Sequence, residues 1–343
     1  MKKYLLALVA SFALVLTACS TNSNETTTEN SETATVEEEA TVENETTEEN
    51  DASETENEAT DAEEAETAEE DASEEAETAD GKVFKIGAIP DFDQAEMEEA
   101  FNDFSEYLSK EIGHPVEFVP TVDYASLVTA FDRGEIQLAW FGGLTVTQAL
   151  NRVPEAEAFA QRPSDQEFKS VFIQQKGLGL TGLEDLKGKT FTFGSESSTS
   201  GHLMPRYFLT EAGINPDEDF DGAPNYSGSH DKTYKLVESG AFQTGAVNVQ
   251  YWEKALDEGL VDDTKVEEFY RTPDFYDYNW TLNKDIDAEF TEGTAQKVKD
   301  TILGMKKEDS KIMDLLSTEE FIETKNENYD LIKQVAEELG MLN

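Results

Sequence analysis

The sequence predicts an α/β fold with mostly parallel sheets for residues 81–343. Short apolar or alternating runs, typical of strands, occur at 83–89, 116–120, 136–141, 171–174, 190–194, 245–249 and 266–270. Amphipathic stretches separate these runs, and in 94–112 the apolar residues recur at the three- and four-residue spacings of a helix. Strands that alternate with helices of this length indicate βαβ units. From about residue 286 onward the pattern predicts helices only.

Residues 1–18 have the features of a secretory signal peptide. Lys2 and Lys3 precede an apolar stretch of about fifteen residues, which is too short for a stable membrane span. The stretch ends in Leu16-Thr17-Ala18-Cys19, which resembles a lipobox and implies cleavage before Cys19 and attachment of lipid to its sulfur. The alternative is an ordinary signal peptide followed by an incidental cysteine. Because Cys19 is the only cysteine, the chain can form neither an internal disulfide nor a thiolate metal cluster.

Residues 19–80 comprise this cysteine and an acidic, low-complexity tract. The tract contains 25 acidic residues, no Lys or Arg and no aromatic residue. It cannot bury enough apolar surface to offset the entropy of ordering, so we expect an extended tether that holds the folded part away from a membrane. The alternative is an interaction tail for cationic partners.

The remaining 263 residues are also acidic, with 50 acidic and 24 basic side chains. This balance argues against binding to nucleic acid or to anionic lipid. The length fits one large domain or two lobes of ordinary size. No internal repeat of fixed period is present.

Small or hydroxyl-bearing residues follow several predicted strands and precede predicted helices. Gly142-Gly143 follows the run 136–141, a serine-rich loop follows 190–194, and Ser227-Gly228-Ser229-His230 opens another helix. Asp123 is the expected N-cap of a helix over 124–133. The N-terminus of a helix offers unpaired N–H groups and a partial positive charge. Several such termini converging on one cleft would hold an oxyanion without Lys or Arg, even in an acidic protein.

Three other chemistries are weakly supported. Gly194-Ser195-Glu196-Ser197-Ser198 lacks the second glycine of a nucleophile elbow. His230 and Asp231 are adjacent on a helix and point in different directions, so Asp231 is poorly placed to orient His230 as the general base of a hydrolase. A phosphate-binding P-loop would need a lysine where His202 stands. The three histidines are far apart in sequence, so no metal site is expected, although carboxylates alone could still bind Ca²⁺.

The segments "FGSESSTSGHLMPRYFL" and "YSGSHDKTYKLVESG" resemble the substrate-binding proteins of phosphate, phosphite and phosphonate ABC transporters. The segment "DYASLVTAFDRGEIQLAWFGGLT" is similar to the first lobe of the same family. Within the family, the chain resembles a branch whose members are labelled selenate binders. The resemblance implies a type II periplasmic-binding-protein fold, with two α/β lobes joined by a two-strand hinge and the ligand between them. We expect the first lobe over 81–175, completed by about 275–343, and the second lobe over 176–274.

The resemblance also implies the ligand-binding residues. Ser198, Thr199 and Ser200 supply hydroxyl and backbone N–H groups to the oxyanion, and His230 donates from the opposite side. The helix residue Tyr124 matches a phosphonate-contacting tyrosine of the first lobe. For each of these residues the alternative is structural: a helix cap for the three hydroxyls, a surface position for His230 and a core aromatic for Tyr124.

Two further positions complete the expected site. Asp277 aligns with a carboxylate that faces the ligand's amine or acidic proton, and a second family tyrosine falls at Phe168, which removes one hydroxyl donor. A family glutamate of the aminoalkylphosphonate pocket is replaced near Gln250-Tyr251, so an aminoethyl ligand is not expected. Asp277 could instead be an exposed loop acid, and Phe168 could be a core residue.

The expected function is therefore uptake of a small tetrahedral phosphorus oxyanion by a monomeric, membrane-tethered lipoprotein outside the cell membrane. Its partners would be an ABC permease and the permease's ATPase, with no cofactor and no catalysis. The alternatives are a binder of selenate or sulfate, a lipoprotein that senses its ligand for a signalling partner, and an enzyme on the same fold. The absence of a cysteine after Cys19 argues against the cysteine-dependent enzymes of this fold.

Overall fold

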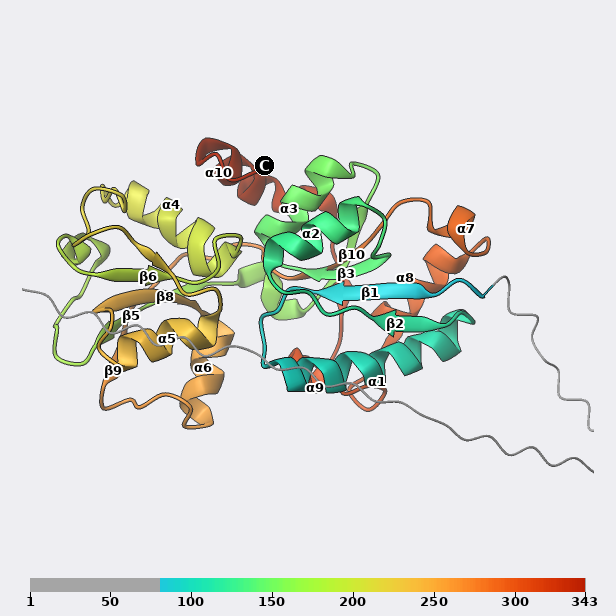
Figure 1. Ribbon diagram of the computed structural model, residues 1–343, viewed down its shortest axis with the longest axis horizontal. Coiled ribbons are helices and arrows are strands. Elements are labelled where there is room, and N and C mark those ends of the chain that lie inside the picture. Colours follow the sequence, from blue (N-terminus) through green and yellow to red (C-terminus); the bar gives the residue numbers. More distant parts are fainter. Residues whose placement is uncertain (1–80, 343) are drawn as a thin grey trace, which may run out of the picture. The chain divides into compact units, whose positions relative to one another are not determined.

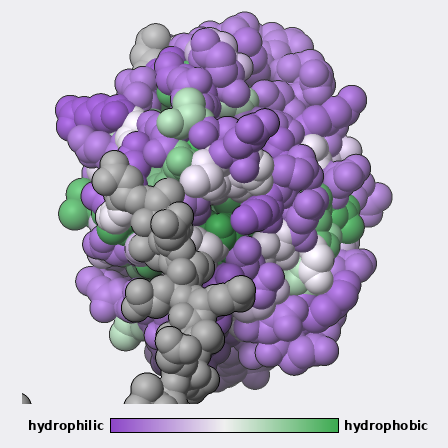
Figure 2. Space-filling model, turned by 90° about the vertical axis from the view of Figure 1, so that its right-hand side faces the viewer, coloured by the Kyte–Doolittle hydropathy of each residue, from purple (hydrophilic) through white to green (hydrophobic). Residues whose placement is uncertain are grey.

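The computed structural model describes residues 81–342, which form two β-sheets with helices on both faces (Figure 1). The expected signal peptide, Cys19 and the acidic tether lie outside the described residues. No helix within 81–342 is both long enough and apolar enough to span a membrane. The face drawn in Figure 2 is mostly hydrophilic, in keeping with the high content of charged residues.

The first sheet has six strands in the order β11-β4-β10-β3-β1-β2. Strands β1, β2 and β3 are parallel, whereas β10 runs antiparallel to both β3 and β4. The strands are β1 Phe84–Ala88, β2 Val116–Phe118, β3 Leu138–Phe141, β4 Glu157–Gln161, β10 Asn279–Leu282 and β11 Ile322–Glu323. The helices of this part are α1 Gln94–Ile112, α2 Tyr124–Asp132, α3 Gly143–Arg152, α7 Ile286–Glu289, α8 Thr294–Gly304, α9 Ile312–Leu315 and α10 Asp330–Glu338.

The second sheet has five strands in the order β7-β6-β8-β5-β9. Its strands are β5 Ser170–Gln175, β6 Phe191–Phe193, β7 Asn225–Tyr226, β8 Thr244–Asn248 and β9 Val266–Arg271. Its helices are α4 Met204–Glu211, α5 His230–Glu238 and α6 Val249–Asp257. Successive residues of β5 serve opposite faces, since Phe172 packs in one cluster with Leu209 of α4, whereas Val171 and Ile173 pack with residues of α5 and α6.

Two chain segments, residues 162–169 and 272–278, connect the two sheets; we call them the linking segments. They pair with each other through Phe168 and Phe275, whose backbone N–H groups each donate to the other's carbonyl at 2.9 Å. The chain thus leaves the first sheet after β4 and returns to it at β10. This arrangement agrees with the expected two-lobed fold and its two-strand hinge.

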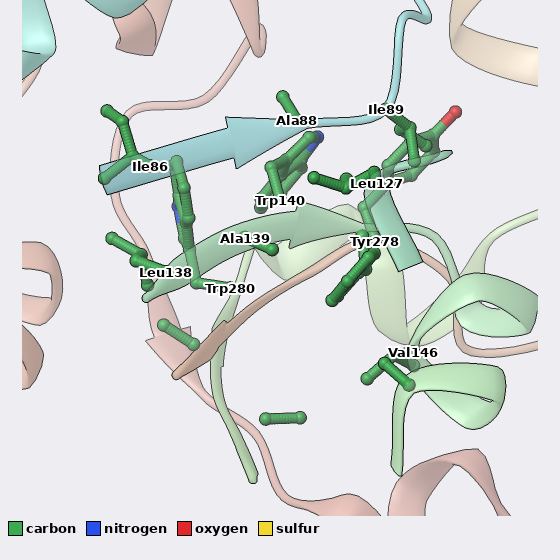
Figure 3. Packing of buried hydrophobic residues seen from close by; sticks show 14 of the residues in the cluster. Ile86, Ala88, Ile89, Leu127, Leu138, Ala139, Trp140, Val146, Tyr278 and Trp280 are labelled. Atoms are coloured by element: carbon green, nitrogen blue, oxygen red, sulfur yellow. The ribbon is translucent and has the colours of Figure 1, made fainter. Parts of the chain in front are cut away.

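The core of the first lobe centres on aromatic side chains from β3 and β10. The Trp140 and Trp280 rings lie 5.2 Å apart, and both side chains are buried (Figure 3). Ile86 and Ala88 of β1 and Leu127 of α2 belong to the same cluster. The two tryptophans are therefore core residues.

The structure corrects three details of the sequence prediction. Strand β5 lies in the second sheet, so the first lobe's sheet ends before residue 170 and not at 175. Strand β11 interrupts the C-terminal part that was expected to be purely helical, because two residues there pair with β4. Strands β4, β7 and β10 were not predicted. The four residues of β10 are all buried, so they carry no alternating pattern.

Candidate ligand-binding site

The N-terminus of α3 contributes backbone donors to a buried polar cluster between the two lobes. Strand β3 ends at Phe141, and the glycines that follow let other side chains approach the backbone closely. The N–H of Gly143 donates to Asp277 Oδ1 at 2.9 Å, and the N–H of Leu144 donates to Thr199 Oγ1 at 2.9 Å. A Cβ atom on Gly142 would lie only 3.1 Å from Asp277 Oδ1 and 3.2 Å from Thr199 Oγ1. Glycine at this position therefore keeps the helix end open to polar partners.

The serine-rich loop between β6 and α4 places Ser198, Thr199 and Ser200 in this cluster. Ser198 caps the following turn by accepting a hydrogen bond from the N–H of Gly201 at 2.9 Å. The turn itself, Thr199–Leu203, is a π-helix, a rare form often found at functional sites. All three hydroxyl residues are buried, and Ser200 Oγ has no hydrogen-bond partner. Ser195 and Ser197, in the same loop, are more exposed.

His202 anchors this loop, a role that the sequence did not indicate. Its Nδ1 lies 2.7 Å from the carbonyl oxygen of Glu196, while Arg206 Nε donates to its Nε2 at 3.1 Å. Burial lowers the pKa of His202 to about 4, so the ring is neutral at physiological pH. The loop that carries the hydroxyls is thus held by an uncharged histidine.

His230 is the first residue of α5 and is fully buried, not on the surface. Its Nδ1 accepts a hydrogen bond from the backbone N–H of Asn248 at 3.3 Å. Because burial lowers the pKa of His230, its ring is neutral and the remaining proton is on Nε2. Nε2 lies 3.4 Å from Asp91 Oδ1 without forming a hydrogen bond, so this donor is available to a ligand.

Asp91 is the centre of a second network that sequence reasoning missed. The Tyr124 hydroxyl donates to its Oδ1 at 2.6 Å, and the Tyr278 hydroxyl donates to its Oδ2. Asn248 Nδ2 in turn donates to the Tyr278 hydroxyl at 2.7 Å. The position of Asp91 directly after β1 was the one available signal, since ligand groups gather at the carboxyl ends of strands in α/β sheets.

Asp277 lies on a linking segment and is buried, so it is not the exposed loop acid that the sequence allowed as an alternative. Its Oδ1 accepts from Gly143, but its Oδ2 has no partner. Burial raises the pKa of Asp277 to about 7, although the Gly143 amide and the Thr199 hydroxyl oppose this shift. The group can therefore exchange a proton near neutral pH.

Phe168 does not point a polar atom at the cluster. Its ring packs against Tyr278 at 5.4 Å and against Phe275 at 6.1 Å, between the linking segments. The Arg162 guanidinium also lies 4.8 Å from the Tyr278 ring and pairs with buried Asp165. Phe168 thus packs against the Tyr278 ring, in an aromatic layer beside the site.

Three of the sequence-predicted residues each carry a buried polar atom without a hydrogen-bond partner. These atoms are Ser200 Oγ, His230 Nε2 and Asp277 Oδ2. An unsatisfied buried polar group costs about 1–3 kcal/mol. The segments that carry them also touch, since a Cβ on Gly201 would lie 3.0 Å from His230 Cε1. The N-terminus of α3 donates hydrogen bonds to both Thr199 and Asp277. The cluster can thus offer a small polar ligand two neutral donors, Ser200 Oγ and His230 Nε2, and one acceptor, Asp277 Oδ2.

This combination of fold and buried cluster defines a two-lobed solute-binding protein. Residues 86–329 match the family model for the periplasmic phosphonate substrate-binding proteins of ABC transporters, and the chain belongs to this family. The family resemblance inferred from the sequence is therefore confirmed.

Individual relatives agree with this assignment. The chain is 40% identical over 270 residues to a probable ABC transporter phosphite binding protein, PhnD1, of Prochlorococcus marinus, covering 76% of this chain and 91% of the relative. The crystal structure of that PhnD1 with methylphosphonate matches 76% of this chain and 100% of its own, with a TM-score of 0.73 and 39% identity. A phosphonate-transporter binding protein of Pseudomonas aeruginosa matches 75% of this chain and 86% of its own, with a TM-score of 0.66 and 20% identity, which supports the fold alone.

Proposed function

We propose that this protein captures a small phosphorus oxyanion, such as phosphite, methylphosphonate or phosphate, and delivers it to an ABC permease and its ATPase. The observation that carries the proposal is the set of unpartnered atoms Ser200 Oγ, His230 Nε2 and Asp277 Oδ2 beside the N-terminus of α3. Neutral donors and a helix terminus suit a tetrahedral oxyanion. The ligands named for the PhnD1 relative are of the same class.

The expected affinity follows from the number of hydrogen bonds. Hydrogen bonds to a charged group contribute about 1.5–3 kcal/mol each. Five to seven of them, less the cost of closing the lobes and ordering the ligand, leave roughly 8–11 kcal/mol. This corresponds to dissociation constants from micromolar to about 10 nM, a range suited to scavenging a scarce nutrient.

Little open space lies beside the Asp91 network in this structure. A cavity of about 20 Å³ lies against Asp91, Asn248 and Tyr278, room for about one water molecule. Tyr251 closes one side of this region, where its ring packs 5.2 Å from Phe92 and 5.6 Å from His230. An aminoethyl group would need more space and a carboxylate partner, and Gln250 bonds instead to Ser164 at 2.7 Å. We therefore expect 2-aminoethylphosphonate to bind poorly.

Binding is coupled to closure of two lobes about the linking segments. In this proposal the first lobe comprises residues 81–161 and 279–342, and the second comprises 170–271. Ligand held by groups of both lobes favours the closed form, which the permease recognises, so no bond is made or broken. The monomeric protein is held at the outer face of the cell membrane by lipid on Cys19, with residues 20–80 as the tether.

Calorimetry on the full-length protein in detergent tests the ligand class. We expect phosphite, methylphosphonate and phosphate to bind with micromolar or tighter dissociation constants, and sulfate, selenate and 2-aminoethylphosphonate to bind at least tenfold more weakly. Ser200→Ala should weaken binding about tenfold, in line with loss of one hydrogen bond to a charged group. Ser195→Ala, in the more exposed part of the same loop, is the matched control. Tighter binding of selenate than of phosphite or methylphosphonate, or no binding of any phosphorus oxyanion, would overturn the proposal.

A further inference from the structure

We propose that Asp91 is a specificity-determining residue, which excludes fully ionised oxyanions such as sulfate by placing a second buried carboxylate beside the ligand. The inference deepens the proposed function and rests on it. Asp91 lies in the loop between β1 and α1 and is only 2% exposed. Its role differs from that of Asp277. Both oxygens of Asp91 accept hydrogen bonds from tyrosine hydroxyls, whereas Asp277 has one oxygen without a partner.

Every strong contact of the Asp91 carboxylate is with a neutral donor. The Tyr124 hydroxyl donates at 2.6 Å, within the range of charge-assisted O–H···O⁻ bonds, and the Tyr278 hydroxyl occupies the other oxygen. Within residues 81–342, no Lys or Arg forms an ion pair with Asp91. The nearest buried cation, Arg162, is bound through two of its nitrogens to Asp165. The negative charge of Asp91 is therefore stabilised locally but not neutralised.

The direction of these hydrogen bonds also decides what the tyrosines can offer. A phenol has one proton to donate. Tyr124 and Tyr278 both give that proton to Asp91, and Tyr278 accepts from Asn248 as well. While these bonds are kept, Tyr124 can present only oxygen lone pairs to a ligand. A ligand that retains a P–OH proton can donate to this side, whereas sulfate has no proton to give near neutral pH.

Electrostatics gives the size of the effect. At an effective dielectric constant of about 20, one additional negative charge about 6 Å from a carboxylate corresponds to roughly a 100-fold loss of affinity. The second proton of inorganic phosphate is lost near pH 7, about one unit above that of a phosphate ester. A phosphorus oxyanion can therefore lower its negative charge by binding a proton, although the free energy needed for this protonation rises with pH. Sulfate stays fully ionised throughout this pH range.

Other ionisable groups around Asp91 affect the same pH dependence. Four titratable side chains face it from α2, α5, α6 and the linking segment 272–278, and two cationic side chains line the adjacent cavity. The groups are Tyr124, His230, Tyr251 and Tyr278, with Asp277 further along the cluster and with Arg162 and Lys254 beside the cavity. Burial lowers the pKa of His230 and raises the pKa of the three tyrosines, so all four side chains are uncharged at neutral pH. Asp277, whose pKa burial raises to about 7, titrates near neutral pH.

The test is calorimetry of the full-length protein with phosphate and sulfate as ligands, at about pH 5 and about pH 8. These two values bracket the second ionisation of inorganic phosphate near pH 7, about one unit above that of a phosphate ester. Wild-type protein should bind phosphate more weakly at the higher pH and sulfate very weakly at both. Asp91→Asn should reduce the phosphate-to-sulfate affinity ratio at least tenfold and flatten the pH profile. Asp93→Asn, an exposed acid two residues away that can still cap α1, should leave both unchanged. Asp277→Asn, measured in parallel, reports the share of the pH profile due to that group.

Three outcomes would count against the proposal, and they are distinguishable. If Asp91→Asn weakens phosphate and sulfate equally and keeps the wild-type pH profile, Asp91 has a structural role only and the inference is wrong. If wild-type protein binds no phosphorus oxyanion at all, the proposed function itself fails. If Asp91→Asn does not fold, Tyr278→Phe serves instead, because it leaves Asp91 charged with one donor fewer. The phosphate-to-sulfate affinity ratio of Tyr278→Phe should then equal or exceed that of wild type. A smaller ratio than in wild type would contradict the role of Asp91.

Discussion

The Asp277 carboxyl is a single group whose protonation links stability to pH. Burial raises its pKa to about 7, above the value of about 3.9 expected in the unfolded chain. The folded state therefore binds this proton more tightly than the unfolded state does. The resulting stabilisation is fully present below about pH 4 and is lost as the pH rises through about 7.

The first prediction concerns this residue in the ligand-free protein. Asp277→Asn carries a neutral amide at all pH values, so it should lose less stability than wild type between about pH 5 and 8, by on the order of a few kcal/mol. Thermal unfolding across this range measures the difference. Asp257→Asn, an exposed position on α6, should follow the wild-type curve. Parallel curves for Asp277→Asn and wild type would show that the buried carboxyl does not titrate in this window.

The sequence prediction named most residues of this buried cluster but not their hydrogen-bond partners. The structure brings Ser198, Thr199, Ser200, His230, Tyr124 and Asp277 together in one buried cluster. Asp91 and Tyr278 were missed as a network, because the direction of a side chain in a loop depends on the packing of other segments. Phe168 is a packing residue beside Tyr278.

At the scale of elements, the loop from β6 to α4 depends on the glycine at position 201. A Cβ there would lie 2.9 Å from Ser198 Oγ, 3.0 Å from His230 Cε1 and 3.2 Å from the Cα of Gly194. The Gly194 contact is with backbone, which cannot move aside easily. The loop and His230 are therefore packed too closely for any side chain at position 201.

The second prediction is that Gly201→Ala displaces Ser198 or His230. It should destabilise the protein by about 1–3 kcal/mol through overpacking and weaken phosphite binding at least tenfold, measured by thermal unfolding and calorimetry. Gly304→Ala is the matched control, since nothing lies within 4 Å of the added Cβ at the end of α8. Unchanged affinity in Gly201→Ala would mean that the loop adjusts without moving the donors.

Helices with one apolar and one polar face could be predicted from the sequence. The spacing of apolar residues over 94–112 matches α1, and Asp123 caps α2 through the N–H of Ser126. The π-helix at Thr199–Leu203 could not be predicted. The four consecutive hydroxyl residues at 197–200 compete for backbone hydrogen bonds, so the segment has no single preferred local form. Strands β7 and β11 have two residues each and exist only through pairing with distant strands.

At the scale of the whole folded part, contacts across the mouth of the site favour the closed form. Phe92 of the first lobe packs 5.2 Å from the ring of Tyr251 in the second lobe. On the same side, Lys254 Nζ lies 3.8 Å from Glu96 Oε2. Neither contact was predictable, because closure brings together residues about 160 positions apart in sequence.

The third prediction separates these two contacts. An exposed ion pair contributes about 0–1 kcal/mol, and a packed aromatic pair contributes about 0.5–1.5 kcal/mol beyond its buried area. Lys254→Gln should therefore change phosphite affinity less than about fivefold, and the change should vanish at high salt because the pair is screened. Phe92→Ala should weaken binding more, about tenfold, with little dependence on salt, because it removes apolar contact across the lobes. Small-angle scattering of each ligand-free variant should show a larger radius of gyration for Phe92→Ala than for Lys254→Gln. Equal and salt-sensitive losses in both variants would instead mean that the ion pair, and not the aromatic contact, holds the two lobes together.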